Sequence, residues 1–417
     1  MHSHQSHRQR LQRQFQIAAA ALAVALLAGV VLIVKNVIAP GTDVASGGGA
    51  PTPPPAASHG SQTGKTAGQK GSPLSSSWRG SGKAVTFAFG GDVHFEGPLA
   101  ERLDDDPQTA LDGDIAALMR GADISMTNFE SALISGACTD PQPKEFVFHA
   151  PPSALTAFKA AHVTLVTEAN NHGEDCGRPG LAQSLAIAKA AHYPIVGIGE
   201  NAAQAFTPYR ATVHGQRIAI FGATAVLDTN LITSWTATAS QPGLASAYQE
   251  GELVSAVQAA RKNSDTVIVF LHWGTETQQC PNSVQVPLAK ALVKAGADIV
   301  VGSHAHVELG AGYMGSALVD YGLGNLAFYD TSAPEIYSGA LHVTITGRHV
   351  DTFSWRPAQI SGGLPVPLTG SAATAAAQRW QGLRGCTGLT AAQGTSLATA
   401  QSETRPFAGP SISPLAG

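Results

Sequence analysis

Between residues 83 and about 357, two kinds of segment alternate along the chain. Short runs rich in β-branched residues predict strands at 85–89, 123–127, 163–167, 195–198, 217–221, 266–272 and 298–301. Ala- and Leu-rich stretches of helical period predict helices at 109–120, 152–160, 179–191, 253–262 and 284–295. A turn at 214–216 and a pair of late runs, 341–346 and 350–355, predict two hairpins. The alternation indicates an α/β fold, and the hairpins indicate that its sheets are mixed.

Polar side chains follow five of these predicted strands at the point where each strand ends. They are Asp92 and His94, Asn128 and Glu130, Asn170, Asn171 and His172, His272, and His304 and His306. Open α/β sheets place their functional sites at the carboxyl ends of their strands. We therefore expect these side chains to meet in one site.

The residue types favour a metal site. Imidazole together with carboxylate suits zinc, iron or manganese, and a carboxylate such as Asp92 or Glu130 can bridge two cations. Asp-x-His and His-x-His place two ligands on the same side of an extended segment. A single histidine at a strand end is more often a hydrogen-bonded structural residue, and Asp92 could be a turn residue. The recurrence at five strand ends outweighs that alternative.

The N-terminal part predicts an exported domain. Residues 17–34 are uninterrupted apolar or small residues, about long enough to cross a bilayer, and Arg8, Arg10 and Arg13 precede them. We expect a cytoplasmic tail at 1–16, a signal anchor at 17–39 and a Gly/Pro/Ser-rich linker at 40–82. A cleaved signal peptide is the alternative, and it also exports the rest of the chain. With 25 Lys and Arg against 29 Asp and Glu, nucleic acid is not an expected partner.

The chain has four cysteines, an even number that an oxidising compartment would pair. Three pairings are possible for Cys138, Cys176, Cys280 and Cys386, and we expect Cys138 with Cys176 and Cys280 with Cys386. A thiolate metal site is the alternative, but no spacing approaches the C-x2-C pattern of zinc sites.

The order of these polar motifs resembles that of calcineurin-like metallophosphoesterases. More closely, residues 84 to 330 resemble the bacterial capsule synthesis protein CapA family, also called the poly-gamma-glutamate biosynthesis family. The resemblance rests on Asn-Phe-Glu at 128–130, Ala-Asn-Asn-His-x-x-Asp-x-Gly at 169–177, His-Trp-Gly-x-Glu at 272–276, Gly-Ala-Asp-Ile-Val-Val-Gly-Ser-His-Ala-His at 296–306 and Tyr-x-Leu-Gly-Asn at 321–325. It implies a four-layer α/β/β/α metallophosphatase-like sandwich over residues 83–360 and two divalent metal ions. A low-complexity tail with one helix at about 372–383 would follow at 361–417.

The resemblance also implies roles for individual residues. Asp92, His94 and His306 would hold one metal, Asn171, His272 and His304 the second, and Glu130 would bridge them. His172 corresponds to a phosphate-contacting histidine and would be catalytic. Asn128, Asn170, Asp175, Glu276 and Asn325 would support the ligands. Two positions depart from the related patterns: Glu130 stands where classical phosphoesterases have Asp, and Cys176 where the family commonly has an aromatic residue.

The function that the resemblance implies is the synthesis or export of a capsule-type surface polymer by a membrane-anchored, extracytoplasmic, metal-dependent protein. Its partners would be an anionic polymer or a phosphate ester and membrane-bound synthesis proteins. The domain has few clustered lysines or arginines with which to bind polyglutamate. An extracellular phosphoesterase of broad specificity and a non-catalytic scaffold of a membrane complex are the alternatives.

Overall fold

The computed structural model describes residues 79–111 and 113–394. The predicted cytoplasmic tail and anchor, most of the linker, and the end of the C-terminal tail lie outside the described residues. Among the residues that are described, no helix has the length and apolar character needed to cross a membrane. Residues 79–82, which we expected in the linker, contact the domain: Gln216 donates a hydrogen bond to the carbonyl of Arg79 at 2.9 Å.

The first sheet is mixed and has the strand order β18-β17-β16-β1-β2-β5-β6, with β15 also paired to β1. Its strands are β1 (Val85–Val93), β2 (Ile124–Phe129), β5 (Leu165–Thr167), β6 (Ile195–Val196), β15 (Asn325–Ala327), β16 (Tyr337–Thr346), β17 (His349–Ser361) and β18 (Leu364–Pro367). β1, β2, β5 and β6 run parallel, whereas β16 and β17 form the predicted late hairpin. The parallel strands end at one edge.

The second sheet has the order β13-β14-β12-β11-β9-β8. Its strands are β8 (Tyr209–Val213), β9 (Gln216–Thr224), β11 (Thr266–Trp273), β12 (Ile299–His304), β13 (Ala311–Met314) and β14 (Ala317–Asp320). β8 and β9 form the predicted hairpin at 214–216, and β9, β11, β12 and β14 are parallel. Two short pairs complete the strands: β3 (Ala132–Leu133) with β4 (His149–Ala150), and β7 (Ile198–Gly199) with β10 (Gly243–Leu244). The expectation of mixed α/β sheets is confirmed.

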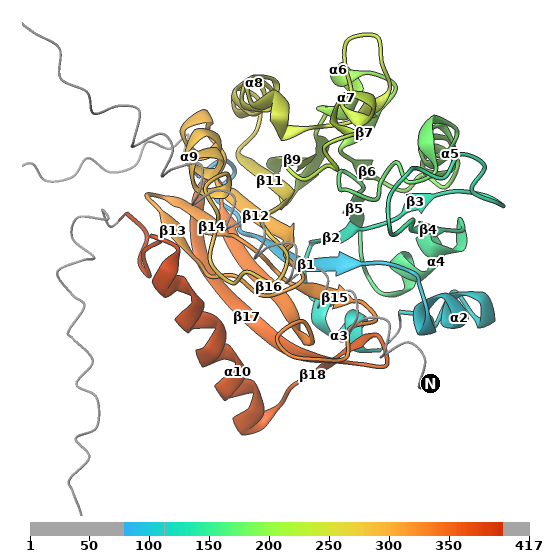
Figure 1. Cartoon of the computed structure of the whole chain (residues 1–417). Helices are drawn as coiled ribbons and strands as arrows, with labels where there is room; N and C mark the ends of the chain where they lie inside the picture. Colours follow the sequence, from blue (N-terminus) through green and yellow to red (C-terminus); the bar gives the residue numbers. More distant parts are fainter. Residues whose placement is uncertain (1–78, 112, 395–417) are drawn as a thin grey trace, which may run out of the picture. The chain divides into compact units, whose positions relative to one another are not determined.

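Apolar side chains place the two sheets face to face. Phe87 and Phe89 of β1 pack in one buried cluster with Ile268 and Phe270 of β11. Helices α8 (Glu250–Arg261) and α9 (Gln285–Ala295) pack on the outer face of the second sheet, as Figure 1 shows. Helices α2 (Pro98–Asp105), α3 (Asp114–Met119) and α4 (Ser153–Ala160) pack on the outer face of the first. The described domain therefore has four layers, helix, sheet, sheet and helix.

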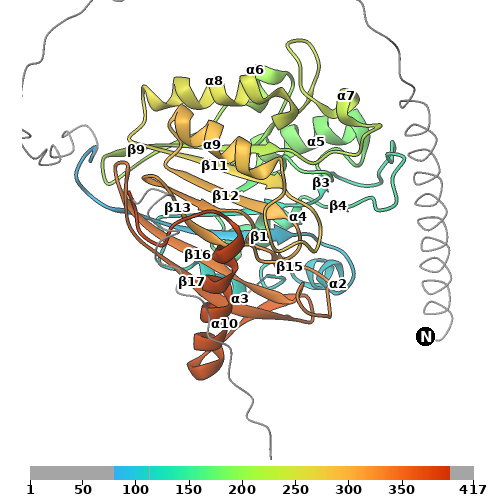
Figure 2. The same cartoon turned by 60° about the vertical axis from the view of Figure 1, so that its left-hand side comes forward.

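Two elements differ from expectation. The helix expected at 109–120 is only α3, because it begins after Gly113, whose φ of 62° is not helical. The fold also continues beyond residue 360, since β18 extends the first sheet and α10 (Gly370–Leu383) packs against β17 (Figure 2). Trp380 of α10 stacks on Trp355 at a centroid distance of 5.3 Å. This stretch is therefore part of the domain.

Helices α5 (Gly177–Ala190), α6 (Ala202–Ala205) and α7 (Ile232–Trp235) and two single turns of 3-10 helix, 247–249 and 384–386, complete the described elements. The disulfides are Cys138–Cys176 and Cys280–Cys386, the pairing that we expected. The second one joins the segment before α9 to the end of the C-terminal helical stretch.

Candidate metal centre

The carboxyl ends of strands from both sheets meet at one site. In the first sheet Asp92 lies opposite Asn128, and Asn128 opposite Thr167. The pairing of β1 with β2 shifts between Phe89 and Asp92, and this irregularity changes the direction in which Asp92 leaves the strand. This path of the backbone requires glycine at position 91. Any other residue would place a Cβ 1.7 Å from the carbonyl oxygen of Gly324.

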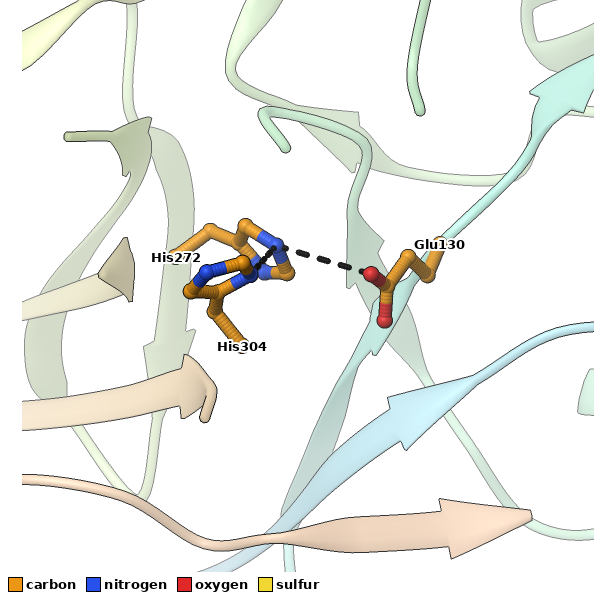
Figure 3. Close-up of side chains that lie close together, drawn as sticks. All are labelled: Glu130, His272 and His304. Carbon is orange, nitrogen blue, oxygen red and sulfur yellow. Dashed lines mark hydrogen bonds and ion pairs between the residues drawn. The ribbon is translucent and has the colours of Figure 1, made fainter. Parts of the chain in front are cut away.

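Two groups of candidate ligands share Glu130. Asp92, Glu130 and His306 form one group, and Glu130, His272 and His304 form the other; within each group the ligand atoms lie within 4.8 Å of one another. Figure 3 shows His272 and His304 beside the Glu130 carboxylate, with His272 Nε2 3.6 Å from Glu130 Oε1. Glu130 thus occupies the position that a bridging ligand would take.

Asn171 and Glu276 lie beside the histidines of these two groups. Asn171 Oδ1 is 2.7 Å from His272 Nε2, and His304 Nδ1 is 3.1 Å from that same nitrogen. Three atoms of types that bind metals, His272 Nε2, His304 Nδ1 and Asn171 Oδ1, therefore lie together in the group formed by Glu130, His272 and His304. Glu276 is exposed to solvent. It forms a further group with His304 and His306, in which the ligand atoms lie within 4.8 Å of one another.

The environment of Glu130 fits a cation. Its side chain is fully buried, and neither carboxylate oxygen has a hydrogen-bond partner among the described residues. Burial raises the pKa of Glu130 well above its usual range, and the neighbouring charge of Asp92 raises it further. A buried carboxylate without donors is costly unless it is protonated or binds a cation. This residue therefore fits a metal ligand better than a structural acid.

Two of the histidines, His272 and His304, are held in the form that binds metals. Burial lowers the pKa of His272 well below its usual range, and His304 and His306 lower it further. Burial also lowers the pKa of His304 to about 3. Neutral imidazole has a free nitrogen lone pair, which is what a metal requires. The close approaches of His272 to Asp92 and to Glu130 are therefore not ion pairs of a charged histidine.

The segment after β12 has an unusual backbone. His304 and His306 have φ values of 95° and 56°, a left-handed region that residues other than glycine rarely adopt. Two contacts hold these residues in place. The His304 N–H donates a hydrogen bond to Asp92 Oδ2 at 3.0 Å, and Asn325 Oδ1 lies 2.8 Å from His306 Nδ1. Such conformations concentrate at functional sites. Asn325 is therefore placed to orient His306, and its role in supporting a metal ligand stays a prediction.

His94 is the candidate ligand that the structure keeps outside these groups. Its ring stacks on Phe328 at a centroid distance of 3.7 Å, and Phe148 meets it edge-on at 5.1 Å. Both ring nitrogens are buried without a hydrogen-bond partner in the described part of the chain. Burial lowers its pKa well below the usual range. The role of His94 as a ligand stays a prediction.

Two of the predicted supporting residues link the strands through amides. Asn128 donates to Asp92 Oδ1 at 2.8 Å and accepts from Asn170 at 3.0 Å. Asn170 in turn accepts from the backbone N–H of His172 at 2.8 Å. The network connects the ends of β1 and β2 to the segment after β5 and fixes their relative positions.

His172 lies beside a lysine that the sequence did not indicate. The Asp175 carboxylate lies 2.6 Å from His172 Nδ1 and 3.0 Å from Lys144 Nζ. Lys144 also donates to the carbonyl of Asn171, and Phe148 stacks on His172 at 4.1 Å. Lys144 stands in a Pro-rich loop, and the expected pairing of nearby Cys138 with Cys176 is a signal that could have placed this loop beside the His172 segment. Ser303, 3.1 Å from His272 Nδ1, was also missed.

Comparisons with known proteins agree on one family. A family model described as "Bacterial capsule synthesis protein PGA_cap" matches residues 86–330. The capsule biosynthesis protein CapA of Bacillus anthracis is 29% identical over 260 residues, which cover 61% of this chain and 62% of that protein. The PGA biosynthesis protein CapA of Bacillus subtilis (strain 168) is 28% identical, with coverages of 61% and 66%. A probable polyglutamine synthesis accessory protein of Mycobacterium tuberculosis is 27% identical, with coverages of 49% and 55%.

The chain spans less than two thirds of the length of the first of these relatives, and about two thirds or less of the others. Among solved structures, a hypothetical protein from Thermus thermophilus gives a TM-score of 0.40 at 15% identity, covering 66% of this chain and 100% of that one. The family model extends over well more than half of the chain and contains every predicted ligand. The chain therefore belongs to the bacterial capsule synthesis protein family PGA_cap.

Proposed function

We propose that this protein acts in the synthesis or export of a capsule-type surface polymer and that its domain is a hydrolase dependent on two divalent metal ions. Poly-gamma-glutamate is the polymer that the family resemblance implies, and one relative is named a PGA biosynthesis protein. The hydrolase proposal rests on one observation: Glu130, buried and without donors among the described residues, lies between two groups of ligand-type atoms.

The candidate ligands fall into two sets, one for each ion, that share Glu130. Asp92, Glu130 and His306, with His94 as a further predicted ligand, would hold one ion, and Glu130, Asn171, His272 and His304 would hold the second. Manganese, iron or zinc suits this mixture of imidazole, carboxylate and amide oxygen. When bound, the ions would act as Lewis acids on a phosphoryl or acyl-type bond.

His172 is the candidate proton donor. Asp175 accepts a hydrogen bond from its Nδ1 side and thereby leaves Nε2 for a substrate oxygen. Burial lowers the pKa of His172, while Asp175 raises it and so opposes part of that shift. Lys144, beside Asp175, fixes this carboxylate and adds a positive charge at the same end of the site.

The location that we propose is extracytoplasmic, behind a single N-terminal anchor at 17–39, with membrane-bound polymer-synthesis proteins as partners. Two disulfides, Cys138–Cys176 and Cys280–Cys386, support an oxidising compartment. A non-catalytic accessory role is the second candidate, because one relative is named an accessory protein. In that role His272→Ala would leave polymer output unchanged, whereas deletion of the domain would abolish it.

The test is the metal content of the full chain, purified without chelator and measured by elemental mass spectrometry. We expect about two equivalents of a transition metal, lost in an Asp92→Ala/His304→Ala double variant and retained in His349→Ala, a histidine of β17 outside the site. The loaded protein should hydrolyse an aryl phosphate, and His304→Ala should abolish that turnover. Absence of metal from the wild type, even after reconstitution with Mn²⁺ or Zn²⁺, would contradict the hydrolase proposal.

A further inference from the structure

The C-terminal segment that begins with α10 lies beyond the match to the family model, which ends at residue 330. It consists of α10, the 3-10 turn at 384–386 and a short stretch in which Thr390 pairs with Tyr313. Figure 1 shows α10 lying along β17. The family match therefore assigns no role to this segment, although its contacts reach two parts of the chain that carry candidate ligands.

Arg379 of α10 binds the segment that carries His304 and His306. Its Nη2 donates to Glu308 Oε2 at 2.8 Å, and Trp355 Nε1 of β17 donates to Glu308 Oε1 at 3.1 Å. The side chain of Glu308 is fully buried, whereas that of Arg379 is 31% exposed. A buried carboxylate is costly unless hydrogen-bond donors and a positive charge compensate it. Arg379 supplies the charge and one of the donors.

Aromatic rings hold Arg379 in place. Its guanidinium lies over the Tyr337 ring, 3.7 Å from the centroid, and the next residue, Trp380, stacks on Trp355 at 5.3 Å. Stacking on an aromatic face orients a guanidinium and leaves its N–H groups available to donate. A packed aromatic surface of β16 and β17 therefore keeps the arginine beside Glu308.

The end of the same segment is bonded to the other part of the chain that carries ligands. Cys386 forms a disulfide with Cys280, which lies in the loop after β11, the loop that also contains Glu276. The two ligand-bearing parts contact each other as well, because the Thr277 N–H donates to the Ala305 carbonyl at 2.8 Å. The C-terminal segment is thus attached to both parts.

We propose that Arg379 is a positioning residue of the candidate metal centre: through Glu308 it holds residues 304–308 in the conformation that presents His304 and His306 to an ion. The inference rests on the proposed function for the ion, whereas the positioning itself requires none. The segment needs support because both histidines have left-handed backbone conformations, with φ values of 95° and 56°. Removing a residue that orients metal ligands typically lowers metal affinity by about 10- to 100-fold.

Hydrogen exchange of the full-length chain in chelator tests the positioning without metal. The quantity measured is the amide exchange rate over 304–309 relative to the rate over β11. In Arg379→Met, which keeps an unbranched apolar side chain but removes the charge and the donors, this ratio should rise at least tenfold. Gln378→Met, at an exposed position of the same helix, should leave it unchanged. Val257→Ala shortens a buried side chain of α8, and it should leave the ratio unchanged although the protein is less stable.

Two further measurements connect the arginine to Glu308 and to the ion. If Arg379 acts through Glu308, the double variant Arg379→Met/Glu308→Gln should show no higher exchange ratio than Arg379→Met alone, because both changes remove one contact. The affinity for Mn²⁺, measured from the electron paramagnetic resonance signal of the free ion, should fall at least tenfold for one of two equivalents in Arg379→Met. It should stay at the wild-type value in Gln378→Met and Val257→Ala.

An unchanged exchange ratio in Arg379→Met, an equal rise in Val257→Ala, or a wild-type Mn²⁺ affinity in Arg379→Met would overturn the inference. Failure of the proposed function gives a different result. A wild type that holds no Mn²⁺ would contradict the hydrolase proposal, while a raised exchange ratio in Arg379→Met would still support the positioning. Two equivalents of Mn²⁺ in the wild type with an unchanged ratio in Arg379→Met would do the reverse.

Discussion

Glu130 is the residue on which the metal centre depends most. Replacing it with Gln keeps the shape of the side chain and removes the charge that the described part of the chain buries without donors. We expect Glu130→Gln to hold at most one equivalent of metal, where the wild type holds about two. In chelator, its free energy of unfolding should be no lower than that of the wild type, because the buried charge is gone. Elemental analysis and urea unfolding measure both effects.

Glu130→Asp is the matched control, since it retains a carboxylate that is one methylene shorter. It should hold more metal than the Gln variant. Two equivalents of metal in Glu130→Gln would show that this side chain does not bridge the two ligand groups.

At the residue scale, the sequence predicted well which side chains come together, because strand ends carry their side chains to a common edge. Asp92, Glu130, His272, His304 and His306 all meet there. What periodicity cannot show is the contact between loops. His94 follows the same rule along the chain, yet Phe148 and Phe328 enclose it, and Lys144 reaches Asp175 from a loop with no pattern of its own.

At the scale of elements, the loop between β3 and β4 depends on its disulfide. Cys138 and Cys176 close a loop of 38 residues, and Cys280 and Cys386 one of 106. Chain entropy predicts that losing either bond costs about 4 to 5 kcal/mol of stability. Only the loss of Cys138–Cys176 should release Lys144 and Phe148 from the segment that contains His172, which both residues contact directly.

Hydrogen exchange separates these two effects. In Cys138→Ser/Cys176→Ser, amide exchange over 139–148 should accelerate relative to the wild type under conditions where both are folded. In Cys280→Ser/Cys386→Ser the same amides should exchange as in the wild type, although the protein is less stable. Equal protection of 139–148 in both variants would mean that hydrogen bonds and packing alone hold the loop.

At the scale of the whole molecule, the alternating segments predicted an α/β fold with mixed sheets, since each element has to bury its apolar face, and the family resemblance implied the four layers. The end of the domain was harder to predict. Residues after 360 are rich in Gly, Ala and Thr, and their place in the fold comes from a few long-range contacts: Trp380 on Trp355, and the bond from Cys386 to Cys280. Composition describes a segment by itself and does not reveal such contacts.

Three buried acids, two between β5 and α5 and one in β14, predict how the stability of the domain depends on pH. Burial raises the pKa of Glu168, Glu174 and Asp320 to about 8 each. Their folded forms keep a proton that the unfolded chain releases near its ordinary pKa of 3.8 to 4.5. The unfolded state therefore binds fewer protons between those values and 8, and stability falls as the pH rises, by at most about 1.4 kcal/mol per pH unit for each group.

Urea unfolding in chelator from pH 5 to pH 8 measures this slope, and two of the three acids, Glu168 and Asp320, can be tested one at a time. Glu168 accepts from Ser184 at 2.6 Å and Asp320 from the Gly322 N–H at 3.0 Å, so Glu168→Gln and Asp320→Asn keep an acceptor oxygen for these bonds while removing the titration. Each variant should reduce the fall of unfolding free energy with pH by the contribution of one carboxyl group. The two reductions should add, because Glu168 follows β5 of the first sheet and Asp320 ends β14 of the second. A wild-type stability that is constant or rises from pH 5 to pH 8 would mean that these carboxyls ionise in the folded protein, and that water or rearranged donors reach them.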